Sequence, residues 1–248
     1  MKFEYYMTAS SGYTKNKALP REWSLIEELF NNRLPFGRNR IPKIIHQIWL
    51  GSDVNDTISS HIDTVKKANP DYQHMLWTDE NIKYFDFKNK ELFLSCRNNG
   101  QKSDILRYAL LEEFGGIYLD TDFIGIKNFD TLLHHHFFTG VSYDSEPTLF
   151  NGLIGCVPNH NLVQELNNFD KPLEDYDGMA VIRTSGPWYL TRKLFKYIKT
   201  KDTDVIVLPL AYFYPFPNFD RDKVKGNDYK DYIAPETICV HLWDSRWN

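Results

Sequence analysis

The stretch Phe114–Asp122, with the sequence FGGIYLDTD, decides the fold expected for this chain. The helical spacing of Lys102–Phe114 stops at two glycines, and the apolar run Ile117–Leu119 then leads directly into Asp120 and Asp122. Glycine commonly follows the last residue of a helix, and a short apolar run between such breakers is typical of a buried strand. The stretch therefore predicts a helix, a tight turn and a strand that ends in two carboxylates.

The sequence on both sides extends this pattern. Lys43–Leu50 is predicted to be a strand, Thr57–Ala68 a helix and Gln73–Trp77 a second strand. Strands that alternate with helices indicate an α/β protein with a parallel sheet between layers of helices. Further strands are predicted near 137–141, 149–156, 205–208 and 237–241, and further helices near 160–168 and 189–198.

Length and composition favour one large domain. The 248 residues contain no linker rich in Pro, Gly or Ser, so residues 41–248 are predicted to form a single domain. Residues 1–40 are predicted to be an N-terminal helical appendage packed on that domain, with a short amphipathic helix at Arg21–Asn32.

Charge and hydropathy exclude several classes of protein. The net charge of −4 comes from intermixed signs, so nucleic acid is not an expected partner. No apolar run reaches the roughly 18 residues of a membrane helix, Met1–Ser10 has no signal-peptide pattern, and no long basic amphipathic helix is evident. We therefore expect a cytoplasmic protein, peripheral at the inner membrane face if it docks at all, with reduced, buried thiols at Cys96, Cys156 and Cys239.

The position of Asp120 and Asp122 distinguishes them from other Asp-x-Asp pairs. Ligands of open α/β sheets bind outside the carboxyl ends of the strands, and only this pair directly follows a predicted strand. Two such carboxylates can hold one hard divalent cation with coordination positions left for phosphate oxygens, and a turn or helix-cap pair without a ligand is the alternative. The other pairs lie in loop-like sequence or before a strand: Asp175 with Asp177, Asp220 with Asp222, and Asp202 with Asp204.

The preceding helix places Asp104 and Arg107 on the same face as Leu111 and Phe114. An i, i+3 ion pair that stabilises the helix explains this placement. Contacts from Arg107 to phosphate or sugar oxygens, and from sugar hydroxyls to Asp104, explain it equally well. The residues alone leave both interpretations open.

Three motifs carry a resemblance to a known family: IPKIIHQIWLG at Ile41–Gly51, Ser103-Asp104-x-x-Arg107-Tyr108, and FGGIYLDTD. They resemble the Asp-x-Asp glycosyltransferases of family 32, which include capsular-polysaccharide transferases and yeast mannosyltransferases. Trp49–Tyr72 is also similar to the catalytic domain of the large clostridial glucosylating toxins. The resemblance covers residues 41–248 and implies a type A glycosyltransferase fold, with a Rossmann-like, mostly parallel sheet flanked by helices.

The resemblance also implies roles for residues around the donor. Trp49 would stack on the base, and a buried core tryptophan at a strand end is the alternative. Asp104 and Arg107 would act in catalysis by holding the donor sugar and phosphate, and Tyr118 would flank the nucleotide. Asn151 would line the sugar side of the same site.

The implied cofactor is Mn²⁺ or Mg²⁺. Asp120 would contact the ribose and reach the metal, Asp122 would ligate it directly, and His241 is either a further ligand or a capped strand-end histidine. Ser245 and Trp247 resemble the family's closing Ser-Trp element over the diphosphate, although an arginine separates them here.

Two other segments need an interpretation. The backbone of Thr184–Pro187 would approach the donor, although turn chemistry explains its glycine equally well. The three consecutive histidines His134–His136 cannot converge on one ion from a regular element, so they are predicted to form a polar loop or strand start.

The sequence thus favours a metal-dependent retaining glycosyltransferase. It would transfer glucose or galactose from a UDP-hexose to a glycan or lipid-linked acceptor in cell-surface polysaccharide synthesis, such as that of a capsule. Transfer from GDP-mannose and protein glycosylation are alternatives within this class. A metal-dependent phosphohydrolase or nucleotidyltransferase, and a Ca²⁺-dependent sugar-binding module, are alternatives from other classes.

Overall fold

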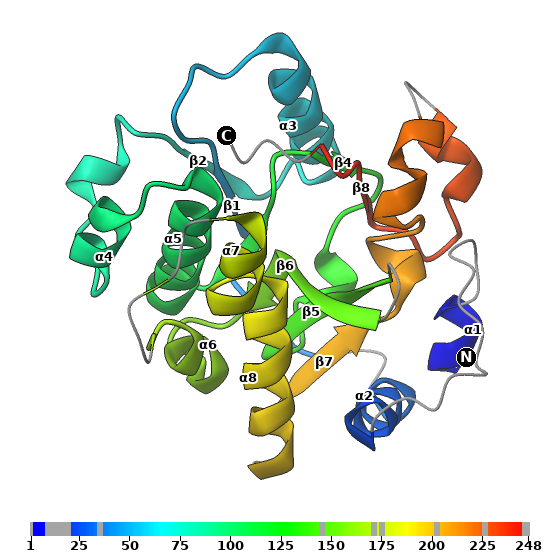
Figure 1. Ribbon diagram of the computed structural model, residues 1–248. Helices are drawn as coiled ribbons and strands as arrows, with labels where there is room; N and C mark the ends of the chain where they lie inside the picture. Colours follow the sequence, from blue (N-terminus) through cyan, green and yellow to red (C-terminus); the bar gives the residue numbers. More distant parts are fainter. Residues whose placement is uncertain are drawn as a thin grey trace.

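The computed structural model describes residues 2–7, 21–33, 37–143, 147–169, 173, 177–200, 204–224 and 228–244. Its centre is a six-stranded sheet with the strand order β2-β1-β3-β6-β5-β7 (Figure 1). Only β6 in this sheet runs against the other strands, so the sheet is largely parallel, as predicted. The strands are β1 (Ile44–Ile48), β2 (Gln73–Trp77), β3 (Gly116–Leu119), β5 (Phe137–Tyr143), β6 (Pro147–Cys156) and β7 (Val205–Leu208).

Helices flank the sheet in an uneven way. α5 (Asn99–Phe114), α6 (Asn161–Leu166) and α8 (Pro187–Thr200) lie in front of the sheet in Figure 1, and α7 (Gly178–Thr184) leads into α8. α3 (Asp56–Ala68) packs instead on a separate two-stranded ribbon of β4 (Phe123–Gly125) and β8 (Cys239–His241). The remaining α-helices of the described chain are α1 (Phe3–Met7), α2 (Arg21–Asn31) and α4 (Lys90–Ser95).

The predicted helices and strands are all present, and the differences concern their ends and the shortest elements. α5 begins at Asn99, before the predicted start, because the Asn98 side chain caps the helix by accepting a hydrogen bond of 3.1 Å from the backbone N–H of Gln101. The sequence did not predict α1, α4, α7 or β4, since helices of five to seven residues are too short to show a helical period and β4 has only three residues.

Two glycines turn the chain from α5 directly into β3. Gly115 and Gly116 have φ angles of 61° and 89°, which residues with a side chain rarely adopt. A Cβ atom on Gly116 would also lie 2.6 Å from the carbonyl oxygen of Ile44 in β1. The glycine pair therefore lets β3 approach β1 closely and aims the end of β3 at the carboxyl edge of the sheet.

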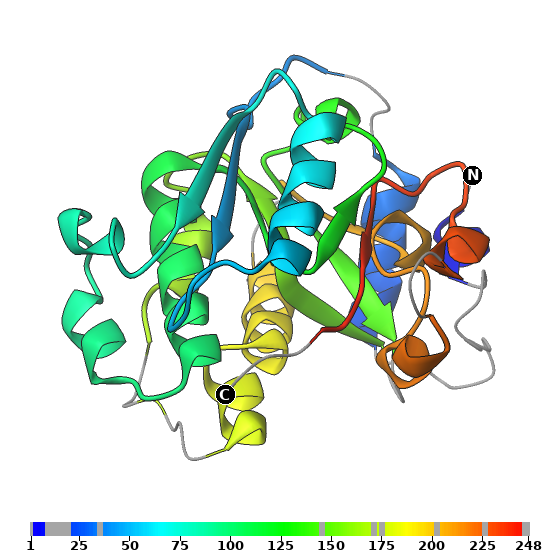
Figure 2. The same ribbon diagram turned by 90° about the horizontal axis from the view of Figure 1, so that it is seen from above.

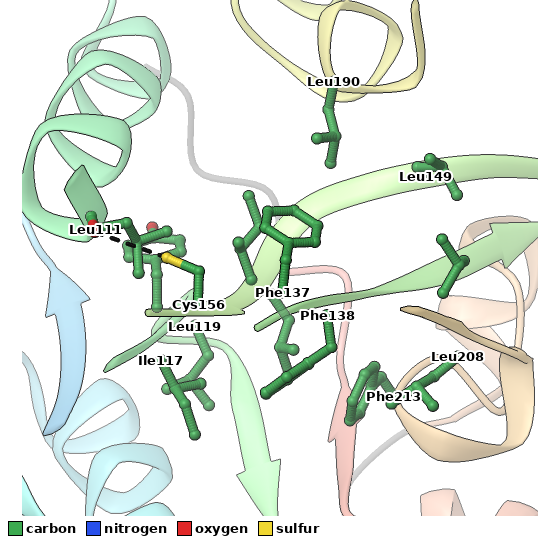
Figure 3. Packing of buried hydrophobic residues seen from close by; sticks show 14 of the residues in the cluster. Leu111, Ile117, Leu119, Phe137, Phe138, Leu149, Cys156, Leu190, Leu208 and Phe213 are labelled. Atoms are coloured by element: carbon green, nitrogen blue, oxygen red, sulfur yellow. Dashed lines mark hydrogen bonds between the residues drawn. The ribbon is translucent and has the colours of Figure 1, made fainter. Parts of the chain in front are cut away.

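The core lies on both faces of the sheet. In Figure 3, Phe137 and Phe138 of β5 point to opposite faces, toward Leu190 of α8 and toward Phe213 respectively. These four side chains are fully buried. Burial of both faces is expected for a sheet with mostly parallel strands.

The N-terminal helices contribute to this same core. Trp23, Ile26 and Phe30 of α2 are buried beside β7, and Phe3 and Tyr6 of α1 join the same hydrophobic cluster. Cys96, Cys156 and Cys239 are buried thiols, as predicted. In the described part of the chain, each helix is too short or too polar to cross a bilayer.

Candidate active site

The strand-end carboxylates lie at the carboxyl edge of the sheet, in the turn between β3 and β4. Asp120 donates a backbone hydrogen bond of 2.8 Å to the carbonyl oxygen of Gly152 in the reversed strand β6. A Cβ atom on Gly152 would lie 2.6 Å from Asp120 Oδ2. The missing side chain at Gly152 thus provides the space that the Asp120 carboxylate occupies.

His241 joins the two aspartates from the β4–β8 ribbon, in which it pairs with Phe123. Its Nε2 atom lies 3.1 Å from Asp122 Oδ1 and 4.0 Å from Asp120 Oδ2. The backbone N–H of Asp244 donates a hydrogen bond of 2.9 Å to Asp122 Oδ2. One possible ligand atom from each of Asp120, Asp122 and His241 lies within 4.8 Å of the other two.

This donor set fits a hard divalent cation. Carboxylate oxygens with one imidazole nitrogen suit Mn²⁺, and oxygens suit Mg²⁺. Burial raises the pKa of Asp120, although the positive charge of Arg107 acts to lower it. The negative charge of Asp122 raises this pKa further. Burial also acts on Asp122, but the charge and hydrogen bond of His241 and the N–H of Asp244 outweigh it and lower the pKa of Asp122. Asp122 is therefore held as the anion that a metal ligand must be.

Arg107 links the carboxylate pair to the helix before it. Its Nη2 atom lies 3.1 Å from Asp104 Oδ1, its Nη1 atom lies 3.4 Å from Asp120 Oδ1, and Nη1 also donates to the carbonyl oxygen of Asn151 at 2.7 Å. The guanidinium carbon lies 4.4 Å from the centre of the Tyr118 ring. The i, i+3 ion pair is thus present, but it is buried and extends to a strand-end carboxylate, unlike an ion pair on a helix surface.

Asp104 is enclosed by hydrogen-bond donors from three elements. Asn151 Nδ2 donates to Oδ1 and Ser185 Oγ donates to Oδ2, each at 2.7 Å. Tyr108 closes the network, since its hydroxyl donates to the carbonyl oxygen of Ser185 at 2.9 Å and lies 3.3 Å from Asn151 Nδ2. Burial raises the pKa of Asp104 to about 6, although the charge of Arg107 and the two hydrogen bonds oppose the rise.

Tyr118 lies beneath Arg107, and its hydroxyl donates a hydrogen bond of 2.6 Å to Asp120 Oδ1. Only 1% of the residue is exposed, so its visible role is to orient Asp120. Its contact with the nucleotide stays a prediction.

Trp49 directly follows β1 and is half-buried at the edge of the same pocket. Its Nε1 atom donates a hydrogen bond of 3.2 Å to the carbonyl oxygen of Asp53. Its backbone N–H donates one of 2.8 Å to the carbonyl oxygen of Trp77. These bonds hold the indole beside the N-terminus of α3, where Asn55 caps the helix and lines the pocket. Stacking on a base stays a prediction.

The pocket, of about 480 Å³, brings together all the predicted site residues that the structure describes. Ser245 and Trp247 lie outside the described residues. The predicted site residues that line the pocket are Trp49, Asp104, Arg107, Tyr118, Asp120, Asp122, Asn151 and His241.

Sequence analysis missed three residues of this site. Trp243 packs on His241 with ring centroids 4.4 Å apart, Asp244 binds Asp122 through its backbone, and Ser185 binds Asp104. Trp243 and Asp244 lie within three residues of His241, which is the signal that points to them. Ser185 lies in Thr184–Pro187, whose backbone was predicted to approach the donor; its side chain contacts Asp104, and the approach to the donor stays a prediction.

The histidine run is not part of this pocket. His134–His136 form the turn directly before β5, as predicted, and line a second cavity of about 550 Å³ with α2 and the start of β7. This cavity lies at the edge of the sheet where β5 and β7 begin, whereas the carboxylates follow the end of β3.

Comparison with known proteins agrees with this geometry. The family model described as "Glycosyltransferase sugar-binding region containing DXD motif" matches residues 55–139. Inositol phosphoceramide mannosyltransferase 1 of Schizosaccharomyces pombe is 30% identical over 238 residues, which cover 92% of this chain and 73% of that protein. A glycosyltransferase of Acanthamoeba polyphaga mimivirus with no characterised activity is 31% identical over 220 residues, which cover 84% of each chain. The chain spans only 48% of inositol phosphoceramide mannosyltransferases 2 and 3 of S. pombe.

Solved structures define the fold class. The PaToxG glycosyltransferase superposes with a TM-score of 0.51 and 23% identity, over 65% of this chain and 71% of that chain. The ligand-free glycosyltransferase domain of the YGT toxin gives a TM-score of 0.50 and 12% identity, over 68% and 80% of the two chains. The fold is thus the type A glycosyltransferase fold. The chain belongs to the glycosyltransferase family whose sugar-binding region contains the DXD motif, here Asp120-Thr121-Asp122.

Proposed function

We propose that this protein is a metal-dependent glycosyltransferase that moves a hexose from a nucleoside diphosphate donor to a hydroxyl group of a lipid-linked acceptor. The observation that carries the proposal is one pocket in which Asp120, Asp122 and His241 lie beside the buried pair Asp104 and Arg107. Such a pocket offers a cation site for the diphosphate and hydrogen-bonding groups for the sugar.

Mn²⁺ or Mg²⁺ held by Asp122 and His241, with Asp120 in reach, would stabilise negative charge on the departing diphosphate. Arg107 places a permanent positive charge beside Asp120. Asp104 and Asn151 are held rigidly enough to orient sugar hydroxyls.

We propose retention of the anomeric configuration without a covalent sugar–enzyme intermediate. The carboxylates of Asp104, Asp120 and Asp122 are already engaged: Asp104 by Ser185, Asp120 by Tyr118, and Asp122 by His241. None is placed as a free nucleophile opposite an acid. Detection of a glycosylated aspartate by intact-protein mass spectrometry after reaction with a slow donor would overturn this part of the proposal.

The donor has two candidates. Three relatives are named inositol phosphoceramide mannosyltransferases, which favours a mannosyl donor such as GDP-mannose. A UDP-hexose, either glucose or galactose, is the second candidate and rests on the resemblance to the clostridial toxins.

The acceptor proposal rests on the same names, which specify a ceramide lipid that carries phosphoinositol. A capsule-type glycan and a protein acceptor are the alternatives.

Thermal unfolding with a panel of nucleotide sugars, with and without Mn²⁺, tests the proposal. A ligand at 100 times its Kd stabilises a protein by about 2.7 kcal/mol, or a Tm shift of roughly 5–10 °C at this size. We expect such a shift for one nucleotide sugar with Mn²⁺, its loss in Asp122→Ala, and its retention in the control Asp63→Ala on the exposed side of α3.

The same ligand panel, with phosphate release assayed beside thermal unfolding, separates the other classes. Stabilisation by free sugar and Ca²⁺ without nucleotide preference would favour a sugar-binding module. Release of phosphate from the nucleotide without sugar transfer would favour a phosphohydrolase. No shift with any nucleotide sugar would contradict the transferase proposal.

A further inference from the structure

We propose that the outer face of α7 and α8 docks on an anionic lipid bilayer and so holds one wall of the catalytic pocket close to the membrane. The choice of a bilayer as partner rests on the lipid-linked acceptor proposed above. The surface is called the α7–α8 face and consists of the exposed residues of Gly178–Thr200.

The charged residues of the α7–α8 segment are all cationic. The segment Gly178–Thr200 contains five cationic residues and no acidic residue, although the chain as a whole carries a net charge of −4. An anionic surface is the complement of such a segment. The cations are Arg183, Arg192, Lys193, Lys196 and Lys199.

Three of these cations and one tryptophan form a stripe along α8. Trp188, Arg192, Lys196 and Lys199 are exposed, and with Thr200 they are the exposed residues of α8. Their spacing of i, i+4, i+8 and i+11 brings them to one side of the helix. Lys199 forms an ion pair with Glu22 at the far end of the stripe, so the end with Trp188, Arg192 and Lys196 is the better surface for a charged partner.

Apolar groups lie at the end of the stripe closest to the pocket. Trp188 is 44% exposed and Met179 of α7 is 45% exposed. The Arg192 guanidinium folds against this end, since it donates to the carbonyl oxygens of Trp188 at 3.2 Å and Arg183 at 2.7 Å. An exposed tryptophan beside arginines is typical of anchors at a membrane–water interface.

The opposite side of the same segment belongs to the active site. Ile182 and Pro187 line the catalytic pocket, and Ser185 between them binds Asp104. Figure 1 shows α7 stacked directly on the N-terminal end of α8, and Figure 2 places α7 at an edge of the molecule. Docking through Trp188 and Met179 would therefore hold the segment that forms one wall of the pocket against the bilayer.

The sequence had predicted no long basic amphipathic helix. α8 has only 14 residues, and its other sides are buried against the domain. Its basic stripe becomes a surface only after the tertiary structure has shown which residues stay exposed.

Co-sedimentation with vesicles tests the proposal. We expect the protein to bind vesicles of phosphatidylcholine mixed with phosphatidylserine much more tightly than vesicles of phosphatidylcholine alone. Arg192→Glu/Lys196→Glu should weaken this binding by about 30-fold or more, because each cation near an anionic surface contributes a factor of roughly five. Trp188→Ala should weaken it as well.

The matched control is Lys66→Glu/Lys67→Glu, which makes the same change in charge on α3. This variant should keep most of the binding. Equal losses in the two double variants, or no binding of the unaltered protein to the mixed vesicles, would overturn the proposal. A dimer without vesicles that Arg192→Glu/Lys196→Glu dissociates would assign the face to a second copy of the chain and also overturn it.

The thermal shift with nucleotide sugar and Mn²⁺, measured without vesicles, separates this proposal from the proposed function. The double variant Arg192→Glu/Lys196→Glu should keep the shift, since neither residue lines the pocket. Vesicle binding without any nucleotide shift would contradict the transferase function alone, and a nucleotide shift without vesicle binding would contradict docking alone.

Discussion

Gly152 shows how a single residue shapes the site. Gly152→Ala is expected to displace the Asp120 carboxylate, because the new Cβ atom would lie 2.6 Å from Oδ2. The kcat/KM for the donor should fall by about 100-fold, the typical effect of a 1 Å displacement in an active site, with little change in Tm. Unchanged kinetics would mean that Asp120 has no part in the reaction.

Gly155 provides a control in the same strand. A Cβ atom there would lie 2.1 Å from the Phe138 ring, which belongs to the core. Gly155→Ala should therefore lower stability by about 1–3 kcal/mol, through overpacking, while the folded fraction keeps its kcat. Urea unfolding and active-site titration measure the two effects separately.

Ser185 is a positioning residue that acts through Asp104. Ser185→Ala removes the hydroxyl that donates to Asp104 Oδ2 at 2.7 Å. We expect about a 10-fold loss in kcat/KM, the effect of one lost hydrogen bond to a charged group, and partial rescue in Ser185→Thr, which keeps the hydroxyl. A loss of Tm with unchanged kinetics would show that the contact only stabilises the fold.

The pKa of Asp104 predicts a pH dependence. Burial raises this pKa to about 6, and the ionised carboxylate is the form that accepts hydrogen bonds from sugar hydroxyls. The kcat/KM should therefore fall as the pH decreases through about 6, and Ser185→Ala should move this decline to higher pH. By linkage, the stability that Asp104 contributes decreases as the pH rises from 3.8 to about 6, because the folded state binds its proton more tightly in that interval. Identical pH profiles of kcat/KM for the unaltered protein and Ser185→Ala would contradict the assignment of this decline to Asp104.

At the scale of elements, His160 links the N-terminus of α6 to Asp204, the residue directly before β7. Its Nδ1 atom accepts a hydrogen bond from the backbone N–H of Leu162 at 3.2 Å, and its Nε2 atom lies 3.1 Å from Asp204 Oδ2. Burial acts to raise the pKa of Asp204, but the hydrogen bond and charge of His160 outweigh it, so this pKa lies below 3.8.

Asp204→Asn should cost about 1 kcal/mol at neutral pH, a small value because one third of the side chain is exposed. A carboxyl with a lowered pKa stabilises the folded state above its unfolded pKa of 3.8, and this stability is lost as the pH falls through the folded pKa. The difference between the two proteins in urea unfolding should therefore shrink below pH 3.8. A difference in stability that does not depend on pH would show that the charge of Asp204 makes no contribution to it.

At the scale of the whole molecule, α1 and α2 share the core of the catalytic domain. Trp23 is 5% exposed and packs edge-on against Phe195 of α8, with ring centroids 5.3 Å apart. Trp23→Ala should destabilise the whole protein by about 3–5 kcal/mol in one cooperative transition. Leu94→Ala, at a position that is 67% exposed, should change stability by less than about 0.5 kcal/mol. A small effect of Trp23→Ala would show that residues 1–40 are only loosely attached.

The local features of the fold could be predicted from the sequence. Strands such as Gln73–Trp77 and Val205–Leu208 were predicted with the observed bounds, since apolar runs between breakers depend on near neighbours only. A strand near 237–241 was predicted, but β4 and its pairing with β8 could not be, because this ribbon of three-residue strands forms only when two distant segments pair. The same pairing brings His241 to Asp122, so the third donor of the metal site depends on a contact that local sequence does not encode.

The sequence by itself determined the class of site: two aspartates at the end of a buried strand, after a helix that carries Asp104 and Arg107. Periodicity, glycine positions and motif spacing are local properties, and they suffice for that conclusion. Only the tertiary structure decided that Arg107 joins Asp104 to Asp120, that Ser185 supports Asp104, and that one side of α8 stays exposed and basic. Hydrogen bonds and burial between residues dozens of positions apart exist only once the sheet has brought their elements together.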